Sequence, residues 1–83
     1  MNIDSLIDEA LADQILSFLK KILRGAGKDP EEVPESSLLR FIKEVRFDIL
    51  GKKRDSIVSD LIQSLGLDDT VANKMYDVVD RLI

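Results

Sequence analysis

Residues 5–24 read SLIDEALADQILSFLKKILR, and this stretch decides the fold class. Apolar side chains recur in it every three or four positions, the spacing that places them on one face of an α-helix. Ser5 is a suitable N-cap and Gly25 a suitable left-handed terminator, so the pattern predicts an amphipathic helix over 5–24. The apolar face comprises Ile7, Leu11, Ile15, Phe18 and Ile22, widened by Leu16, Leu19 and Leu23.

Three later stretches repeat this periodicity and predict helices over 35–50, 56–65 and 69–82. The main interhelical loop is expected at 25–34, where residues 29–32 (DPEE) suit a single helical turn because proline favours the first position after a capping aspartate. No alternating strand pattern occurs. We therefore expect an all-α protein, a compact single domain of four bundled helices.

Composition excludes several kinds of chemistry. The chain has 83 residues with no cysteine and no histidine, which rules out disulfides, thiolate or imidazole metal sites and histidine-assisted nucleophiles. Its carboxylates do not have the spacing of a calcium-binding loop. We expect a protein that is not an enzyme and that carries no cofactor or metal.

The N-terminus MNIDSLIDEA is acidic and lacks the basic and apolar regions of a signal peptide. No apolar run approaches the roughly 18 residues of a membrane span. The acidic first half of the 5–24 helix would be repelled by anionic lipid, which argues against membrane binding. These features predict a cytoplasmic protein.

The net charge of −4 is unevenly distributed. Residues 1–19 and 55–83 each carry a net −4, whereas residues 20–54 carry a net +4. This balance argues against tight nucleic-acid binding, which needs a concentrated positive surface. It allows the acidic ends to cover the basic middle, or two copies to pair. A nucleic-acid-associated regulator using the basic middle segment remains an alternative.

The 35–50 helix has a second apolar side. On a helical wheel Leu38, Ile42, Val45 and Ile49 cluster together, whereas Phe47 points almost opposite. Aromatic anchors with basic rims are typical of protein interfaces. The candidate partner-binding residues are Leu39, Lys43, Arg46, Phe47, Leu50, Lys52, Lys53 and Arg54.

Phe47 has two interpretations. A central helix in a small bundle contacts neighbours on both sides, which places Phe47 in the core, and this is our expectation for Phe47 itself. The strip formed by Leu39, Lys43, Arg46 and Leu50 is expected to be partly exposed and to contact another chain.

Ser56, within RDSIVSDL (54–61), is either a modified serine or a helix cap. DPEEVPESSLL (29–39), DSI (55–57) and DDTVANKMYDVVDRLI (68–83) resemble parts of acyl and peptidyl carrier proteins. The resemblance implies a phosphopantetheine arm on a serine at the start of the second helix. Ser56 instead opens the third predicted helix, and no aspartate precedes Ser37. We therefore interpret Ser56 as a cap and keep the carrier domain as an alternative.

The sequence predicts a non-enzymatic helical module that acts by protein–protein contact, as an adaptor, inhibitor, immunity-type or regulatory protein. Its partner is expected to be another protein or a second copy of itself.

Overall fold

The structure, a computed structural model, describes residues 9–83. These residues form the predicted all-α bundle of α1 (Glu9–Gly25), α2 (Glu35–Phe47), α3 (Arg54–Leu65) and α4 (Asp69–Leu82), with a short 3-10 helix η2 (Pro30–Glu32) after α1. The predicted cap at Ser5 lies outside the described residues. Within the described range, no helix is both long and apolar enough to cross a membrane.

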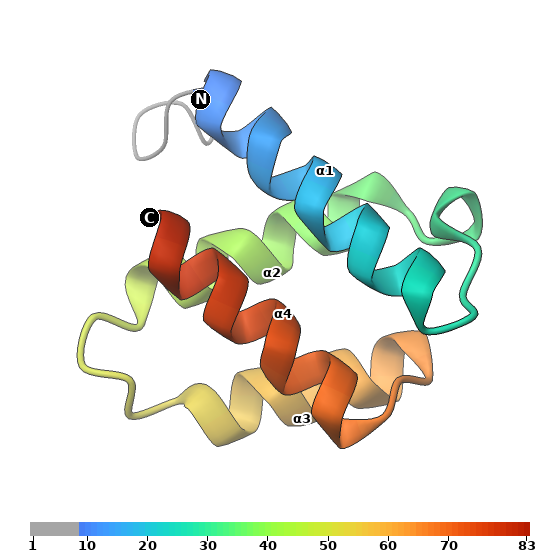
Figure 1. Cartoon of the computed structure of the whole chain (residues 1–83). Helices are drawn as coiled ribbons and strands as arrows, with labels where there is room; N and C mark the ends of the chain where they lie inside the picture. The colour runs from blue at the N-terminus through green and yellow to red at the C-terminus, as the bar shows by residue number, and fades with distance from the viewer. Residues whose placement is uncertain (1–8) are drawn as a thin grey trace.

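α4 lies at the middle of the bundle, where it packs against α1, α2 and α3 (Figure 1). The core takes apolar side chains from all four helices, and burying each one contributes about 1.5–3 kcal/mol to stability. The largest fully buried side chains are Ile15, Leu19 and Leu23 of α1, Leu38 and Ile42 of α2, and Met75 and Val79 of α4. Among the described residues, Tyr76 is the one buried side chain that carries a polar group, its hydroxyl.

The end of α1 differs from the prediction. Gly25 is the last helical residue, and the left-handed residue is Gly27, with φ at +83°. The Lys28 N–H donates to the Leu23 carbonyl and the Gly27 N–H to the Arg24 carbonyl, the pair of bonds that closes a helix in a Schellman motif. Gly25 and Gly27 both lie near the end of the helix. The prediction of Gly25 as the left-handed residue is wrong, because Gly27 has that conformation.

The loop after α1 contains the predicted single turn. The Asp29 carboxylate accepts a hydrogen bond from the Glu31 N–H at 3.0 Å, and Pro30 occupies the first position of η2 and is buried. The capping aspartate and the proline together explain why this turn forms here.

α2 is one turn shorter than predicted. It ends at Phe47, and the Asp48 N–H bonds to the carbonyls of Glu44 and Val45. The predicted helix to Leu50 is therefore wrong, and Ile49 does not belong to the buried face. Its side chain is 82% exposed.

α3 begins earlier than predicted. Lys53 occupies the N-cap position and no side chain of its own caps the helix, so Ser56 stands in the first turn and is not the cap. Asp55 also lies in this turn, where its negative charge interacts favourably with the positive end of the helix dipole. The N–H of Lys53 instead donates to the carboxylate of Asp48, in the turn between α2 and α3, a contact that the local pattern did not reveal.

Candidate functional site

The turn that follows α2 exposes three large apolar side chains. Phe47 is 58% exposed, Ile49 82% and Leu50 76%. The turn is closed by a hydrogen bond from the Gly51 N–H to the Asp48 carbonyl, and Gly51 has a φ of +68° that other residues rarely adopt. We call Phe47, Ile49 and Leu50 the apolar turn. It lies on the segment that leaves the bundle between α2 and α3 (Figure 1).

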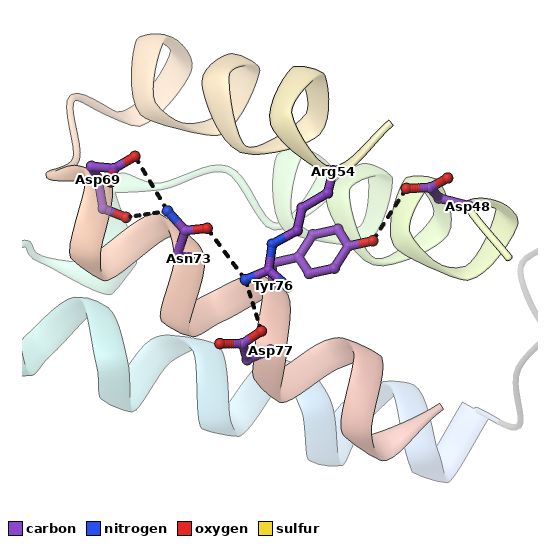
Figure 2. A network of polar contacts seen from close by, with 6 residues as sticks. All are labelled: Asp48, Arg54, Asp69, Asn73, Tyr76 and Asp77. Atoms are coloured by element: carbon purple, nitrogen blue, oxygen red, sulfur yellow. Dashed lines mark hydrogen bonds and ion pairs between the residues drawn. The ribbon is translucent and has the colours of Figure 1, made fainter. Parts of the chain in front are cut away.

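Asp48 holds this turn in place. Its carboxylate oxygens accept the Lys53 N–H at 3.2 and 3.1 Å, which supplies the missing cap at the start of α3. One of the same oxygens accepts a hydrogen bond from the Tyr76 hydroxyl at 3.2 Å (Figure 2). The turn is thereby fastened at both ends and tied to α4.

Arg54 extends this network along α4. Its guanidinium stands 4.5 Å from the centroid of the Tyr76 ring, 2.8 Å from an Asp77 carboxylate oxygen and 3.3 Å from the Asn73 side-chain oxygen (Figure 2). The Asn73 amide in turn donates to the Asp69 carbonyl and carboxylate. Arg54 thus fastens α3 to α4 and is already engaged within the protein.

The surroundings of Tyr76 raise its pKa above the usual 10.0. The largest cause is burial of the phenol, followed by the hydrogen bond to Asp48 and the negative charges of Asp48 and Asp80. The positive charge of Arg54 acts in the opposite direction. The neutral phenol is therefore the form that the fold holds in place as a hydrogen-bond donor.

Two hollows flank the apolar turn. One, of about 220 Å³, lies beside Phe47 and is bordered by Glu44, Lys53 and Ile57. The other, of about 180 Å³, lies beside Ile49. Its remaining lining residues are Val45, Arg46, Asp48, Asp80 and Ile83.

Basic side chains surround the same turn. Lys52 and Lys53 are exposed just after it, and Arg46 is half-buried just before Phe47. Lys43 is exposed one helical turn before Phe47 and so lies on the same side of α2. Of the nearby acids, Glu44 pairs with Arg40 at 3.8 Å and Asp48 accepts internal hydrogen bonds.

The structure regroups the predicted partner surface. Phe47 was expected in the core, which is wrong, because α2 ends there and the chain turns away from the bundle. Leu50 does not continue a strip on α2, and Leu39 is half-buried against the core. Arg54 is engaged with α4.

Ile49 is the exposed apolar residue that the sequence prediction missed. The signal was present in DILG (48–51), since aspartate at the first and glycine at the fourth position favour a β-turn. It was hidden because Ile49 also fits the apolar spacing of the preceding helix.

Ser56 is exposed in the first turn of α3, and no hydrogen bond of its side chain occurs within the described range. Across residues 9–83, no group of three or more carboxylates is arranged to hold a metal ion. Comparisons with protein-family models, curated proteins and solved structures found no match to this chain.

Proposed function

We propose that the protein is a non-enzymatic interaction module that binds an acidic partner protein through the apolar turn. The observation that carries the proposal is the exposure of Phe47, Ile49 and Leu50, each by more than half, within four residues. Single exposed apolar residues are common on protein surfaces, but an aromatic and two aliphatic side chains together are typical of an anchor.

The rigidity of the turn supports this function. The hydrogen bonds that the Asp48 carboxylate accepts from the Lys53 N–H and the Tyr76 hydroxyl hold the turn in the unbound protein. A surface that is already ordered loses less conformational entropy on binding, so more of the energy of apolar burial contributes to affinity. A mobile loop with the same composition would bind more weakly.

The charges around the turn favour an acidic partner over a second copy. In a symmetric dimer the same patch meets itself, which would bring Arg46, Lys52 and Lys53 of each chain together. Like charges placed opposite one another disfavour such a contact. A partner with an apolar pocket and an acidic rim complements both features.

The test uses capture from lysate of the source organism, followed by affinity measurement with the purified partner. Phe47→Ser/Leu50→Ser should lose the captured protein and weaken its binding by about thirtyfold or more, because interface anchors contribute roughly 2 kcal/mol or more. Phe18→Ser is the matched control, since Phe18 is also an exposed aromatic residue, at 40%, but lies on α1.

The binding of the purified partner should also weaken with salt and with Lys52→Glu/Lys53→Glu. Equal binding by the wild type and Phe47→Ser/Leu50→Ser would overturn the proposal. If the wild type forms a dimer at micromolar concentration and Phe47→Ser/Leu50→Ser is a monomer, the partner of the apolar turn is a second copy of the chain and not an acidic protein.

Two alternatives can be tested in the same preparations. Exposed Ser56 keeps the carrier-domain alternative open, and it requires a mass increase of one phosphopantetheine after treatment with a phosphopantetheinyl transferase. The basic residues near the turn keep the nucleic-acid alternative open, and it requires salt-sensitive retention on heparin.

A further inference from the structure

A groove of about 490 Å³ lies between the C-terminal end of α1 and the part of α4 from Thr70 to Val78. Its apolar walls are formed by Phe18 and Ile22 on one side and by Val71 and Val78 on the other. Phe18 was predicted on the buried face of its helix, yet it is 40% exposed in this groove. In Figure 1 the C-terminal end of α1 and the start of α4 lie toward the right of the view, whereas the loop between α2 and α3 lies toward the left.

Two lysines stand on the opposing walls of the groove, Lys21 on α1 and Lys74 on α4, and no acidic residue lines it. Within residues 9–83, neither ammonium group lies within 4.0 Å of a carboxylate. The Lys21 ammonium instead lies 5.9 Å from the centroid of the Phe18 ring. Lys74 stands in the middle of α4, so the dipole of its helix does not explain it.

From this arrangement we infer that the groove binds a single-chain amphiphile with an anionic head group, such as an alkyl carboxylate. The four apolar side chains would contact the hydrocarbon, and the two lysines would pair with the head group. Apart from these ammonium groups, the Thr70 hydroxyl is the polar side-chain group in the lining, which suits a ligand without polar groups along its body.

The size of the groove favours a small ligand over a protein. Nine residues line it, whereas a stable protein interface uses about 20–30 residues on each side. A second copy is also disfavoured. If its apolar turn entered the groove, Lys52 and Lys53 would be brought against Lys21 and Lys74.

The test is a methyl NMR titration of the full chain with decanoate, below its micelle-forming concentration. Saturable shifts are expected at Ile22, Val71 and Val78, with no change in the overall fold by circular dichroism. Decyltrimethylammonium has the same chain and an opposite charge, so it should bind at least about fivefold more weakly. This comparison uses the unmodified protein and therefore does not depend on a variant that folds.

Lys21→Glu/Lys74→Glu should reverse the preference, because both side chains are exposed and each substitution replaces a positive charge with a negative one. Lys43→Glu/Lys52→Glu makes the same charge change away from the groove and should keep the preference for decanoate. Equal binding of the two amphiphiles, shifts centred on Ile49 and Leu50, or no saturable shift would each overturn the inference. Binding of an acidic helical peptide but not of decanoate would also overturn it, and would identify a protein-docking groove.

Discussion

The Tyr76 hydroxyl donates a hydrogen bond to the Asp48 carboxylate across 3.2 Å, joining residues 28 positions apart in the sequence. The same carboxylate accepts the Lys53 N–H. One side chain therefore connects the end of α2, the start of α3 and the middle of α4. The position of the apolar turn depends on it.

Asp48→Ala should loosen this turn while leaving the bundle folded. It removes the acceptor for Lys53 and Tyr76, a loss of about 1–2 kcal/mol in the free energy of unfolding. Hydrogen exchange should accelerate at the amides of Gly51 and Lys53 and stay unchanged in the core of α1. Tyr76→Phe removes only one of these bonds and should cost about 0.5–1.5 kcal/mol. Unchanged exchange at Lys53 in Asp48→Ala would contradict this role.

Tyr76 should make the protein less stable at alkaline pH. Its pKa is raised in the folded state, mainly by burial, and is about 10 in the unfolded chain. Between these two values the unfolded state has released its proton and the folded state has not. The contribution of Tyr76 to the free energy of unfolding should therefore be constant below pH ~10 and fall above it, by up to about 1.4 kcal/mol per pH unit, until the phenol ionises in the folded protein.

This titration can be followed by absorbance because the chain has one tyrosine and no tryptophan. Tyr76→Phe should abolish the part of the alkaline fall that belongs to this residue. Asp48→Asn should move the folded-state pKa downward, since it removes a negative charge that opposes ionisation. A folded-state titration at or below the midpoint of the denatured protein would show that the phenol is not held as described.

Helix periodicity accounts for the parts of this fold that could be predicted from sequence. α4 runs over the predicted 69–82, and Ile15 and Leu19 of the predicted apolar face are fully buried. The start of α3 was missed because it depends on a group outside the local pattern. The start of α3 is capped by Asp48, five residues before Lys53, and the position of Asp48 is supported by Tyr76. A local pattern carries no information about such a bond.

Arg54 should contribute more to stability than its ion-pair partner Asp77. The two side chains are 37% and 53% exposed, so solvent screens their pair and Asp77→Ala should cost less than about 1 kcal/mol. Arg54→Ala also loses the contact with the Tyr76 ring and the bond to Asn73, and should cost about 1–2 kcal/mol. Denaturant unfolding measures both values. A larger loss for Asp77→Ala would mean that the ion pair dominates.

Phe47→Ala should hardly change stability, although phenylalanine is usually a core residue. Its side chain is 58% exposed, so we expect a loss below about 0.5 kcal/mol. Leu19→Ala is the matched core substitution, because Leu19 is fully buried, and it should cost about 2–5 kcal/mol. Thermal unfolding at several protein concentrations separates stability from association. A loss of several kcal/mol in the free energy of unfolding of Phe47→Ala would show that Phe47 is a core residue.

Ser56→Ala should also be close to neutral, within about 0.5 kcal/mol, because Ser56 does not cap α3. A loss of 1 kcal/mol or more in denaturant unfolding, as expected for a true N-cap, would contradict the observed start of the helix.

The candidate site was only partly predictable. The residue types around Phe47, Lys52 and Lys53 indicated a surface, and these side chains are exposed together. Their grouping depended on where α2 ends, because a helix to Leu50 would have hidden Ile49 and placed Leu50 on the same helix face as Leu39. A turn of four residues changed which side chains share a face.

Two glycines near the end of α1 should respond in opposite ways to alanine. Gly25 is helical with no heavy atom within 4 Å of an added Cβ, so Gly25→Ala should stabilise by up to about 0.5–1 kcal/mol through helix propensity. Gly27 has equal space but a φ of +83°, so Gly27→Ala should destabilise by about 1–2 kcal/mol. The difference isolates backbone strain from crowding, because neither methyl group meets a neighbour. Denaturant unfolding measures the free energy of unfolding of both variants. A loss of stability in Gly25→Ala and a gain in Gly27→Ala would show that Gly25 is the left-handed residue that ends α1.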